Sequence, residues 1–442
     1  MRNAPPGQIG LRVVDQHVLY FLGVWVLYFF VLAVVPLSSV YGSLSAAVFI
    51  DALFVAIVAL ISTISRTDVT ESSLAPKLLA PQLAADIVMI GVALSFIGLA
   101  ALVYDRIAIQ GIRFSEGIAV ARIQWQRGGE AREGVSSIFS VFGYACSTSF
   151  FVSLGVLLIQ FETLPKWLVR ISIGLIFVVM MGGSLLAGGR STILLAAAFV
   201  LAFYCIRIEG GGAPIRLSSR GWLLLGALAS IAFAYVLYLF FLRASAGNMG
   251  PVLYTRSYMD WLGARPDGWM LSLTDNDPVD GIIALIILTL TYFVHSAYIL
   301  AAILELPKEN AIILFSYPLV LMAKIGLIAP IDTNWALAGR FASVPGGLYH
   351  DFGPAGLVAG ASLLGLGCGM VQQLRRAWSS SVVLIGVAAG LYATLFLSPI
   401  VLALDTLSFP FIMLEFILVP VTAYAVATLR RLRTHKSRPL RM

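Results

Sequence analysis

Long runs of apolar residues recur along the whole chain and are separated by short polar segments. A run of roughly 20 apolar residues is what a helix needs to cross the hydrocarbon core of a bilayer. A chain in lipid must satisfy its own backbone hydrogen bonds, and strand-like alternation is absent, so the runs predict helices. The pattern predicts twelve spans, at residues 17–36, 44–63, 84–104, 136–160, 167–187, 191–207, 222–242, 282–303, 311–330, 354–374, 382–404 and 408–428.

Composition favours an all-α polytopic membrane protein that forms one membrane domain over residues 1–442. Hydrophobic residues make up 60% of the chain and charged residues only 12%, with a mean hydropathy of +0.94. Soluble domains carry about 25% charged residues, so this chain could not cover a soluble surface. Its three cysteines lie in or at the ends of apolar runs and are spaced neither for a metal nor for an expected disulfide: Cys146, Cys205 and Cys368.

The basic residues predict that both termini face the cytoplasm of a bacterial inner membrane. With twelve spans, the cytoplasmic segments collect 18 of the 29 lysines and arginines, as the positive-inside rule requires. Six of them lie in the basic tail at 429–442, which is expected to lie against anionic lipid, so the net charge implies no nucleic-acid partner. The loops 105–135, 243–281 and 331–353 then face the periplasm. The first of these breaks the rule because it carries five arginines, and its side stays open.

Four arginines on the outer face are candidates for binding an anion. Arg190 lies in AGGRSTILLA, between two spans that only a glycine-rich turn connects. Free N–H groups, a helix start and a guanidinium fork together suit a phosphate. Arg243 ends the seventh span, and Arg256 and Arg340 lie in the outer loops. The alternative for each is an arginine that extends to the lipid headgroups.

Histidines and buried charges add further candidates. His350 and Asp351 lie between glycines at the membrane edge, where they form a general base or a hydrogen-bond donor, or merely cap a helix. His295, inside the eighth span, either bonds a neighbouring helix or joins the site. Lys324 either adds positive charge to the site or extends outward. His17 is expected to be solvated at the cytoplasmic end.

Two acidic residues lie inside apolar runs, where a charge is costly unless it faces a cavity or a partner. Asp51 and Glu415 are counter-ions or proton relays on this interpretation. The segment SLTDNDPVDG resembles a calcium loop, but its spacing fails, and Asp280 is expected to cap the next helix. Phosphate-binding loops and nucleophile elbows are absent from the sequence. We therefore expect neither a metal nor a cofactor.

Two segments resemble a known family. AGGRSTILLA and PGGLYHDFGPAGLVAGASLLGLG are similar to stretches of the oligosaccharide repeat-unit polymerases, the Wzy-type O-antigen polymerase family. The architecture is similar over the whole chain, whereas the motifs cover only these two segments. Five residues match the family's late motif, the first two of them loosely: Gly346, Tyr349, Phe352, Gly353 and Gly356.

The resemblance implies a membrane glycosyltransferase of GT-C-like architecture that joins undecaprenyl-diphosphate-linked repeat units on the periplasmic face. Arg190, Arg256 and Arg340, followed by Arg243, would stabilise the diphosphate leaving group without a metal. His350 or Asp351 would act as the base or orient the acceptor, with Tyr349 as a further candidate. Implied partners are the lipid-linked glycans, the bilayer, and a chain-length regulator and flippase of the same pathway.

Two alternatives stay open at this point. An O-antigen ligase is the nearer one, although its usual histidine-rich outer loop is not evident. A flippase or other transporter for the same lipid-linked glycans is the second, because twelve spans suit it and Asp51 and Glu415 could couple protons. An internal two-fold repeat, typical of many transporters, is not visible in the sequence.

Overall fold

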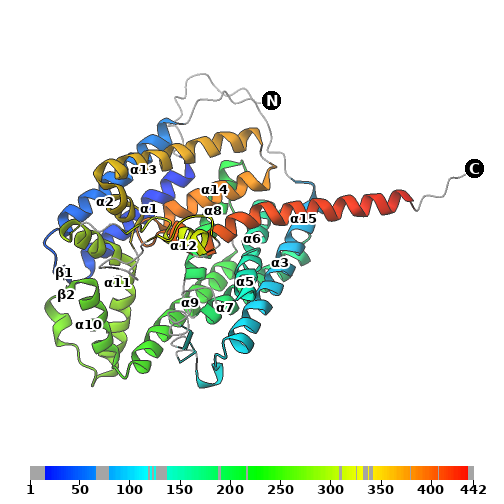
Figure 1. Cartoon of the computed structure of the whole chain (residues 1–442). Helices are drawn as coiled ribbons and strands as arrows, with labels where there is room; N and C mark the ends of the chain where they lie inside the picture. Colours follow the sequence, from blue (N-terminus) through cyan, green and yellow to red (C-terminus); the bar gives the residue numbers. More distant parts are fainter. Residues whose placement is uncertain are drawn as a thin grey trace, which may run out of the picture.

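The computed structural model describes residues 15–65, 79–117, 120–121, 124–125, 137–187, 191–215, 218–307, 311–324, 326–331, 337, 342–378, 380–406 and 408–436. Helices dominate it (Figure 1). The elements in chain order are α1 Gln16–Val34, β1 Leu37–Ser39, α2 Leu44–Ile64, α3 Pro81–Tyr104, the π-helix η1 Asp105–Ile109, η2 Phe114–Glu116, α5 Ile138–Ser147, α6 Phe150–Ile159, α7 Lys166–Ala187, α8 Ser191–Glu209, α9 Ser219–Ala246, α10 Pro251–Leu262, β2 Ala264–Pro266, η3 Gly268–Ser272, α11 Pro278–Glu305, α12 Ser316–Lys324, α13 Val344–Ala377, α14 Val382–Leu397, η4 Ala403–Asp405 and α15 Ser408–Lys436.

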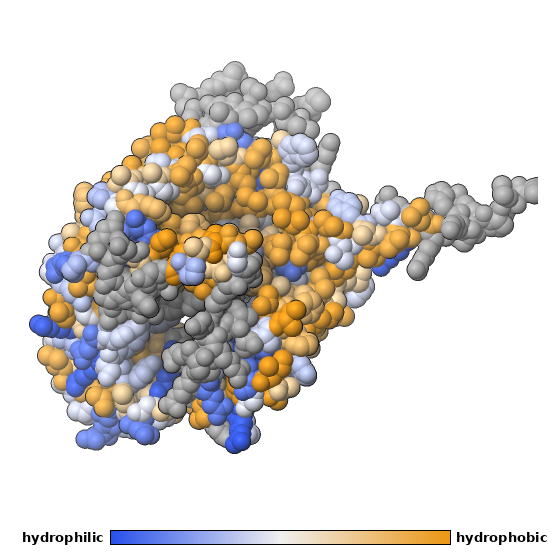
Figure 2. All heavy atoms as spheres, viewed as in Figure 1, coloured by the Kyte–Doolittle hydropathy of each residue, from blue (hydrophilic) through white to orange (hydrophobic). Residues whose placement is uncertain are grey.

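Several of these helices are long and apolar enough to cross a membrane. The described part of the chain contains nine, or ten if α9 and α10, which are bent by 91° at their junction, form one broken span. Figure 2 shows hydrophobic side chains over most of the visible face, with hydrophilic ones gathered at the lower left, over α10 and the β-strands. An all-α polytopic membrane protein is therefore confirmed, while the count of twelve spans is not.

The described residues of 311–330 do not form the membrane span that the sequence predicts. This segment contains only α12, whose nine residues reach about half the thickness of a hydrocarbon core. Phe315 and Gly326, with φ of 64° and 76°, turn the chain on either side of this helix. The next-to-last expected span is also shorter than predicted, because α14 ends at Leu397 and a short turn follows.

The two ends of the helix bundle are distinct. At one end, which we call the tail end, the start of α1 meets the ends of α2, α8 and α13. The C-terminal helix α15 leaves the bundle here (Figure 1). Its Arg430 forms an ion pair at 2.8 Å with Asp86, which lies near the start of α3. At the opposite end of α1, the loop end, β1 pairs antiparallel with β2, so residues 37–39 and 264–266 lie together.

Aspartates organise the segment between α10 and α11. Asp275 accepts hydrogen bonds from the backbone N–H groups of Val252 and Leu253 at 2.7 and 3.1 Å, and so caps α10 from across the loop. Asp277 is the N-cap of α11. The expectation that Asp280 caps this helix is wrong, because its carboxylate accepts instead from the Thr274 N–H at 2.9 Å.

The expected loop 105–135 begins later than predicted. The chain continues from α3 into the π-helix η1, where Asp105 and Arg106 are buried. The Arg106 guanidinium donates to Gln110 and Tyr144, both at 3.0 Å, and lies over the Trp125 ring at 4.5 Å. This arginine is held by side chains of the protein, so it carries no information about the side of the membrane.

Candidate functional site

The motif around His350 forms a short helix, residues 344–352, which is buried except at its end and which we call the short helix. The Ser343 hydroxyl caps its start by accepting from the Gly346 N–H at 3.0 Å, and Pro345 suits the first turn. The short helix ends at Gly353, whose φ of 69° and ψ of −164° belong to a region that only glycine adopts readily. Pro354 then begins the long part of α13.

The chain folds back at Gly353. In a straight helix, Leu348 and Gly360 would be about 18 Å apart along the axis. Instead, a Cβ added to Gly360 would lie 2.4 Å from the Leu348 side chain. Backbone hydrogen bonds fix the other side of the short helix, from Val344 to Ser398 at 2.9 Å and from Leu402 to Ala342 at 3.1 Å. Because Gly346 also lies near Ile303 of α11, the short helix is at the loop end.

His350 and Asp351 form a hydrogen-bonded pair at the end of the short helix. His350 Nδ1 lies 2.8 Å from Asp351 Oδ1, and both side chains are buried. The Asp351 carboxylate also accepts from the N–H groups of Ile313 at 3.0 Å and Leu314 at 2.7 Å. A carboxylate held by backbone donors is an acceptor, so Nδ1 carries the proton and Nε2 is the basic nitrogen. The pair has the geometry of a base and its orienting acid.

The other predicted site residues lie on different helices or outside the described residues. Tyr349 is half-buried in the short helix, beside His350. His295 is buried in α11, where Nδ1 contacts the Tyr292 carbonyl oxygen at 2.6 Å and the ring lies against the Tyr292 ring. Arg243 is half-buried in the last turn of α9. Arg190, Arg340 and the side chain of Lys324 lie outside the described residues.

Arg256 binds backbone carbonyl oxygens of the segment that follows its helix. Its guanidinium donates to the carbonyl oxygens of Leu271 and Leu273 at 2.9 and 3.0 Å, and to Met270 at the limit of 3.5 Å. These bonds fix η3 against α10. The helix α10 packs on α11, α9 and β2, so the structure does not join Arg256 to His350 through a direct packing of their helices.

The tail end contains a polar cluster that was not predicted, the Glu209 cluster. Its centre is Glu209 of α8, and its other members are His17, Ser62, Arg375 and Tyr392. His17 Nδ1 lies 2.7 Å from Glu209, and Nε2 lies 2.9 Å from the Ser62 hydroxyl. Tyr392 donates to Glu209 at 2.9 Å, while Arg375 is 3.5 Å away.

The expectation that His17 is solvated is therefore wrong: its side chain is fully buried. Its ring stacks on Tyr392, with centroids 4.4 Å apart. Its hydrogen-bond partner Glu209 is 192 residues distant in sequence. The only sequence signal was the position of His17 and Glu209 at the ends of apolar runs, which is equally typical of solvated residues.

Asp51 and Glu415 are buried inside the bundle. Neither Asp51 oxygen has a hydrogen-bond partner among the described residues, and the same is true of Glu415 Oε2. Tyr28, near Asp51, bonds the Ser296 hydroxyl at 2.9 Å. The burial that the sequence predicts for both acids is therefore confirmed.

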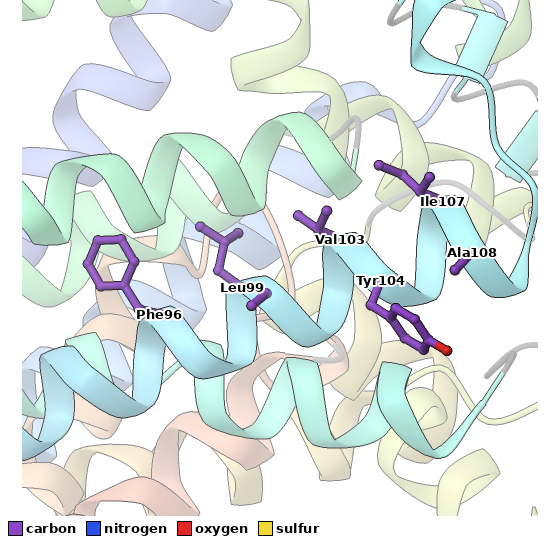
Figure 3. Close-up of a pocket in the computed structure, with 7 residues that line it drawn as sticks. Phe96, Leu99, Val103, Tyr104, Ile107 and Ala108 are labelled. Carbon is purple, nitrogen blue, oxygen red and sulfur yellow. The ribbon is translucent and has the colours of Figure 1, made fainter.

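An apolar groove of about 550 Å³ runs along the second half of α3 and into η1 (Figure 3). A lining of this kind suits hydrocarbon, and it offers no base and no cation, so the groove is not the reactive centre. Its lining residues are Phe96, Leu99, Ala100, Val103, Tyr104, Ile107 and Ala108.

Comparison of the chain with protein-family models, with curated proteins and with solved structures finds no match. The function must therefore be inferred from the residues themselves and from the short motifs.

Proposed function

We propose that the chain is a polymerase that joins undecaprenyl-diphosphate-linked repeat units of a surface polysaccharide at the periplasmic face of the inner membrane. The observation that carries the proposal is the His350–Asp351 pair, which lies in the segment that resembles the Wzy-type family. Gly353 and Gly356 of that segment have a clear task, because one allows the chain to fold back and the other leaves room for the short helix. These two glycines thus shape the helix that carries the pair.

The reaction proposed is a glycosyl transfer. The acceptor hydroxyl of one repeat unit attacks the anomeric carbon of the growing chain, and the bond from that carbon to the diphosphate oxygen breaks. His350 Nε2 takes the hydroxyl proton, while Asp351 holds the ring and stabilises the imidazolium that forms. Undecaprenyl diphosphate leaves with the bonding electron pair, and its negative charge needs cations that are already in place.

We assign that charge stabilisation first to Arg190 and Arg340. Arg256 would bind the diphosphate only by giving up its bonds to the η3 carbonyls, and Arg243 remains the fourth candidate. Lysine at position 190 would keep the charge but lose the two-pronged geometry. We expect Arg190→Ala to abolish polymerisation, since removing one such donor costs about a hundredfold or more in rate, and Arg190→Lys to leave it weak. Wild-type polymer from both variants would remove Arg190 from the mechanism.

Gel analysis of the surface glycan from a strain without this gene tests the proposal as a whole. A polymerase defect leaves a single repeat unit on the lipid core. If no repeat unit is attached, the protein is a ligase or a flippase and the proposal is wrong. Normal chain lengths, with the gene shown to be expressed in the parent strain, contradict all three functions.

The second candidate is a flippase or transporter for the same lipid-linked glycans. The buried carboxyl groups of Asp51 and Glu415 favour it, because acidic residues inside spans are typical of proton-coupled pathways. Uptake of labelled lipid-linked glycan into vesicles that contain the purified protein separates it from the polymerase, which would lengthen the glycan without moving it.

A further inference from the structure

A turn inside one membrane span brings a hydroxyl group next to a buried acid. The helices α5 and α6 together pass for a single span, Ile138–Ile159, but they are separated at Thr148 and Ser149. Here the backbone tightens: Thr148 bonds Ala145, and Ser149 bonds Cys146, each three residues back. A stretch of this kind inside a helix often marks a functional position.

Most hydroxyl groups around this turn are used by the backbone. Ser147 donates to the Tyr144 carbonyl oxygen at 3.3 Å and Thr148 to Ala145 at 2.7 Å. Ser153 donates to Val88 of α3 at 3.0 Å. Ser149 differs, because its hydroxyl oxygen is fully buried and has no hydrogen-bond partner among the described residues.

Glu415 of α15 lies next to Ser149. Only 2% of the Glu415 surface is exposed, and its Oε2 has no partner in the described part of the chain. Among the described residues, Cys146 of α5 is a second titratable group close to it, and on α3 the small residue Gly91 lies near the Ser149 carbonyl oxygen. The described ion pairs do not include Glu415, so no basic side chain among them compensates its charge.

We propose that Glu415 and Ser149 form a proton-binding site within the membrane. An ionised carboxylate at the centre of a span costs several kcal/mol, so the acid must be neutral or carry a cation. A proton satisfies both orphan oxygens at once, since the carboxylic O–H donates to Ser149 Oγ. Sodium would need several oxygen ligands, whereas the carbonyl groups of Ala145, Cys146, Thr148 and Ser149 already accept backbone N–H groups.

Occupancy of this site controls how α15 packs. With the proton bound, α15 lies against α3 and the α5–α6 turn, as observed. Loss of the proton leaves a carboxylate that must be hydrated or paired, which separates α15 from the turn. The proposal is independent of the glycan chemistry, because neither residue takes part in it.

Thermal unfolding of the purified protein in detergent, measured from mildly acidic to alkaline pH, tests the site. The folded protein keeps a proton that the unfolded chain releases, so wild-type stability should fall as the pH rises. Glu415→Gln carries a permanently neutral side chain of the same shape and should lack this part of the pH dependence. The proposal is overturned if the difference in stability between the two proteins stays constant over the pH range.

Carbodiimide labelling then locates the proton, because the reagent adds to a protonated carboxyl group in apolar surroundings. We expect an adduct on Glu415 at neutral pH that Ser149→Ala loses at a lower pH than the wild type does. Ser153→Ala, which removes a hydroxyl group used by Val88, is the matched control and should keep the wild-type profile. Protection of Glu415 by sodium but not by choline would assign the site to sodium and refute the proton.

Discussion

Two histidine–carboxylate pairs lie at opposite ends of the bundle and have almost the same geometry. His17 and Glu209 are 2.7 Å apart at the tail end, and His350 and Asp351 are 2.8 Å apart at the loop end. Both pairs are buried. The difference lies in what surrounds them, and it separates a structural cluster from a candidate catalytic one.

The tail-end pair connects helices that are distant in sequence. Both ring nitrogens of His17 bond residues of other helices, and the Glu209 carboxylate also meets Arg375 and Tyr392. At the loop end, the histidine and its acid are neighbours on one short helix, and the acid is fixed by backbone N–H groups. The first arrangement ties α1, α2, α8, α13 and α14 together, while the second orients a single imidazole. The same distance between histidine and acid thus occurs in two different settings, whose roles the following variants separate.

The largest expected effect distinguishes the two histidines. We expect His350→Gln to slow polymerisation by about 100-fold to 10,000-fold, the usual contribution of a general base, with little change in the melting temperature. His17→Gln should lower the melting temperature while the folded protein stays active. Polymer chain length measures the effect on activity, and thermal unfolding of the purified variants measures the effect on stability. A fully active His350→Gln would show that the loop-end pair is structural as well.

The two acids, Glu209 and Asp351, should also differ. Replacing Glu209 should mainly lower stability, and replacing Asp351 should mainly lower activity. Glu209→Gln leaves the Arg375 guanidinium without its buried counter-ion, and breaking such a pair costs on the order of 3–5 kcal/mol. Asp351→Asn keeps the shape but presents an NH₂ group to the ring or to the backbone donors, so the imidazole loses its fixed tautomer. We expect chemical denaturation to find Glu209→Gln the less stable variant and activity assays to find Asp351→Asn the less active one. The reverse order in both assays would exchange the roles of the two ends.

Hydropathy predicts the transmembrane class and most of the helices, because lipid selects for apolar length directly. It overestimates 311–330 because a mean hydropathy does not register Pro318, Gly326 and the turn at Phe315. Hydropathy also does not reveal the tightened turn at Thr148, where the Ser147 and Thr148 side chains donate to backbone carbonyl oxygens of their own helix.

The candidate site is predictable only where it is local. His350 and Asp351 are adjacent in sequence and lie among glycines, so the sequence singles them out. The fold-back at Gly353 and the amide donors of Ile313 and Leu314 depend on tertiary contacts. Arg256 stands out in the sequence as a free cation, yet loop carbonyls 15 and 17 residues away bind it. Contacts of this range leave no periodic trace in the sequence.

Gly353 tests whether the short helix needs its fold-back. Alanine is strained at this backbone conformation by about 1–3 kcal/mol, although nothing lies within 4 Å of the added Cβ. Gly174 of α7 also has space for a Cβ and has no positive φ, so Gly174→Ala is the matched control and should be neutral or slightly stabilising. Of the two variants, we expect only Gly353→Ala to be less stable and to make shorter polymer. If the two variants behave alike in denaturation and in polymer length, the bend at Gly353 has no role.

The smallest expected effect compares one serine at each end. Ser62→Ala removes the hydroxyl group that meets His17 Nε2, and Ser343→Ala removes the N-cap of the short helix. Each should cost about 1 kcal/mol of stability, so denaturation alone would not distinguish them. Activity should, because fraying of the short helix displaces His350, whereas a weaker Glu209 cluster leaves the loop end in place. We therefore expect shorter polymer from Ser343→Ala and normal polymer from Ser62→Ala at equal protein levels in the membrane. Shortened polymer from Ser62→Ala would mean that the two ends are coupled through the bundle, and the division between a structural and a reactive end would fail.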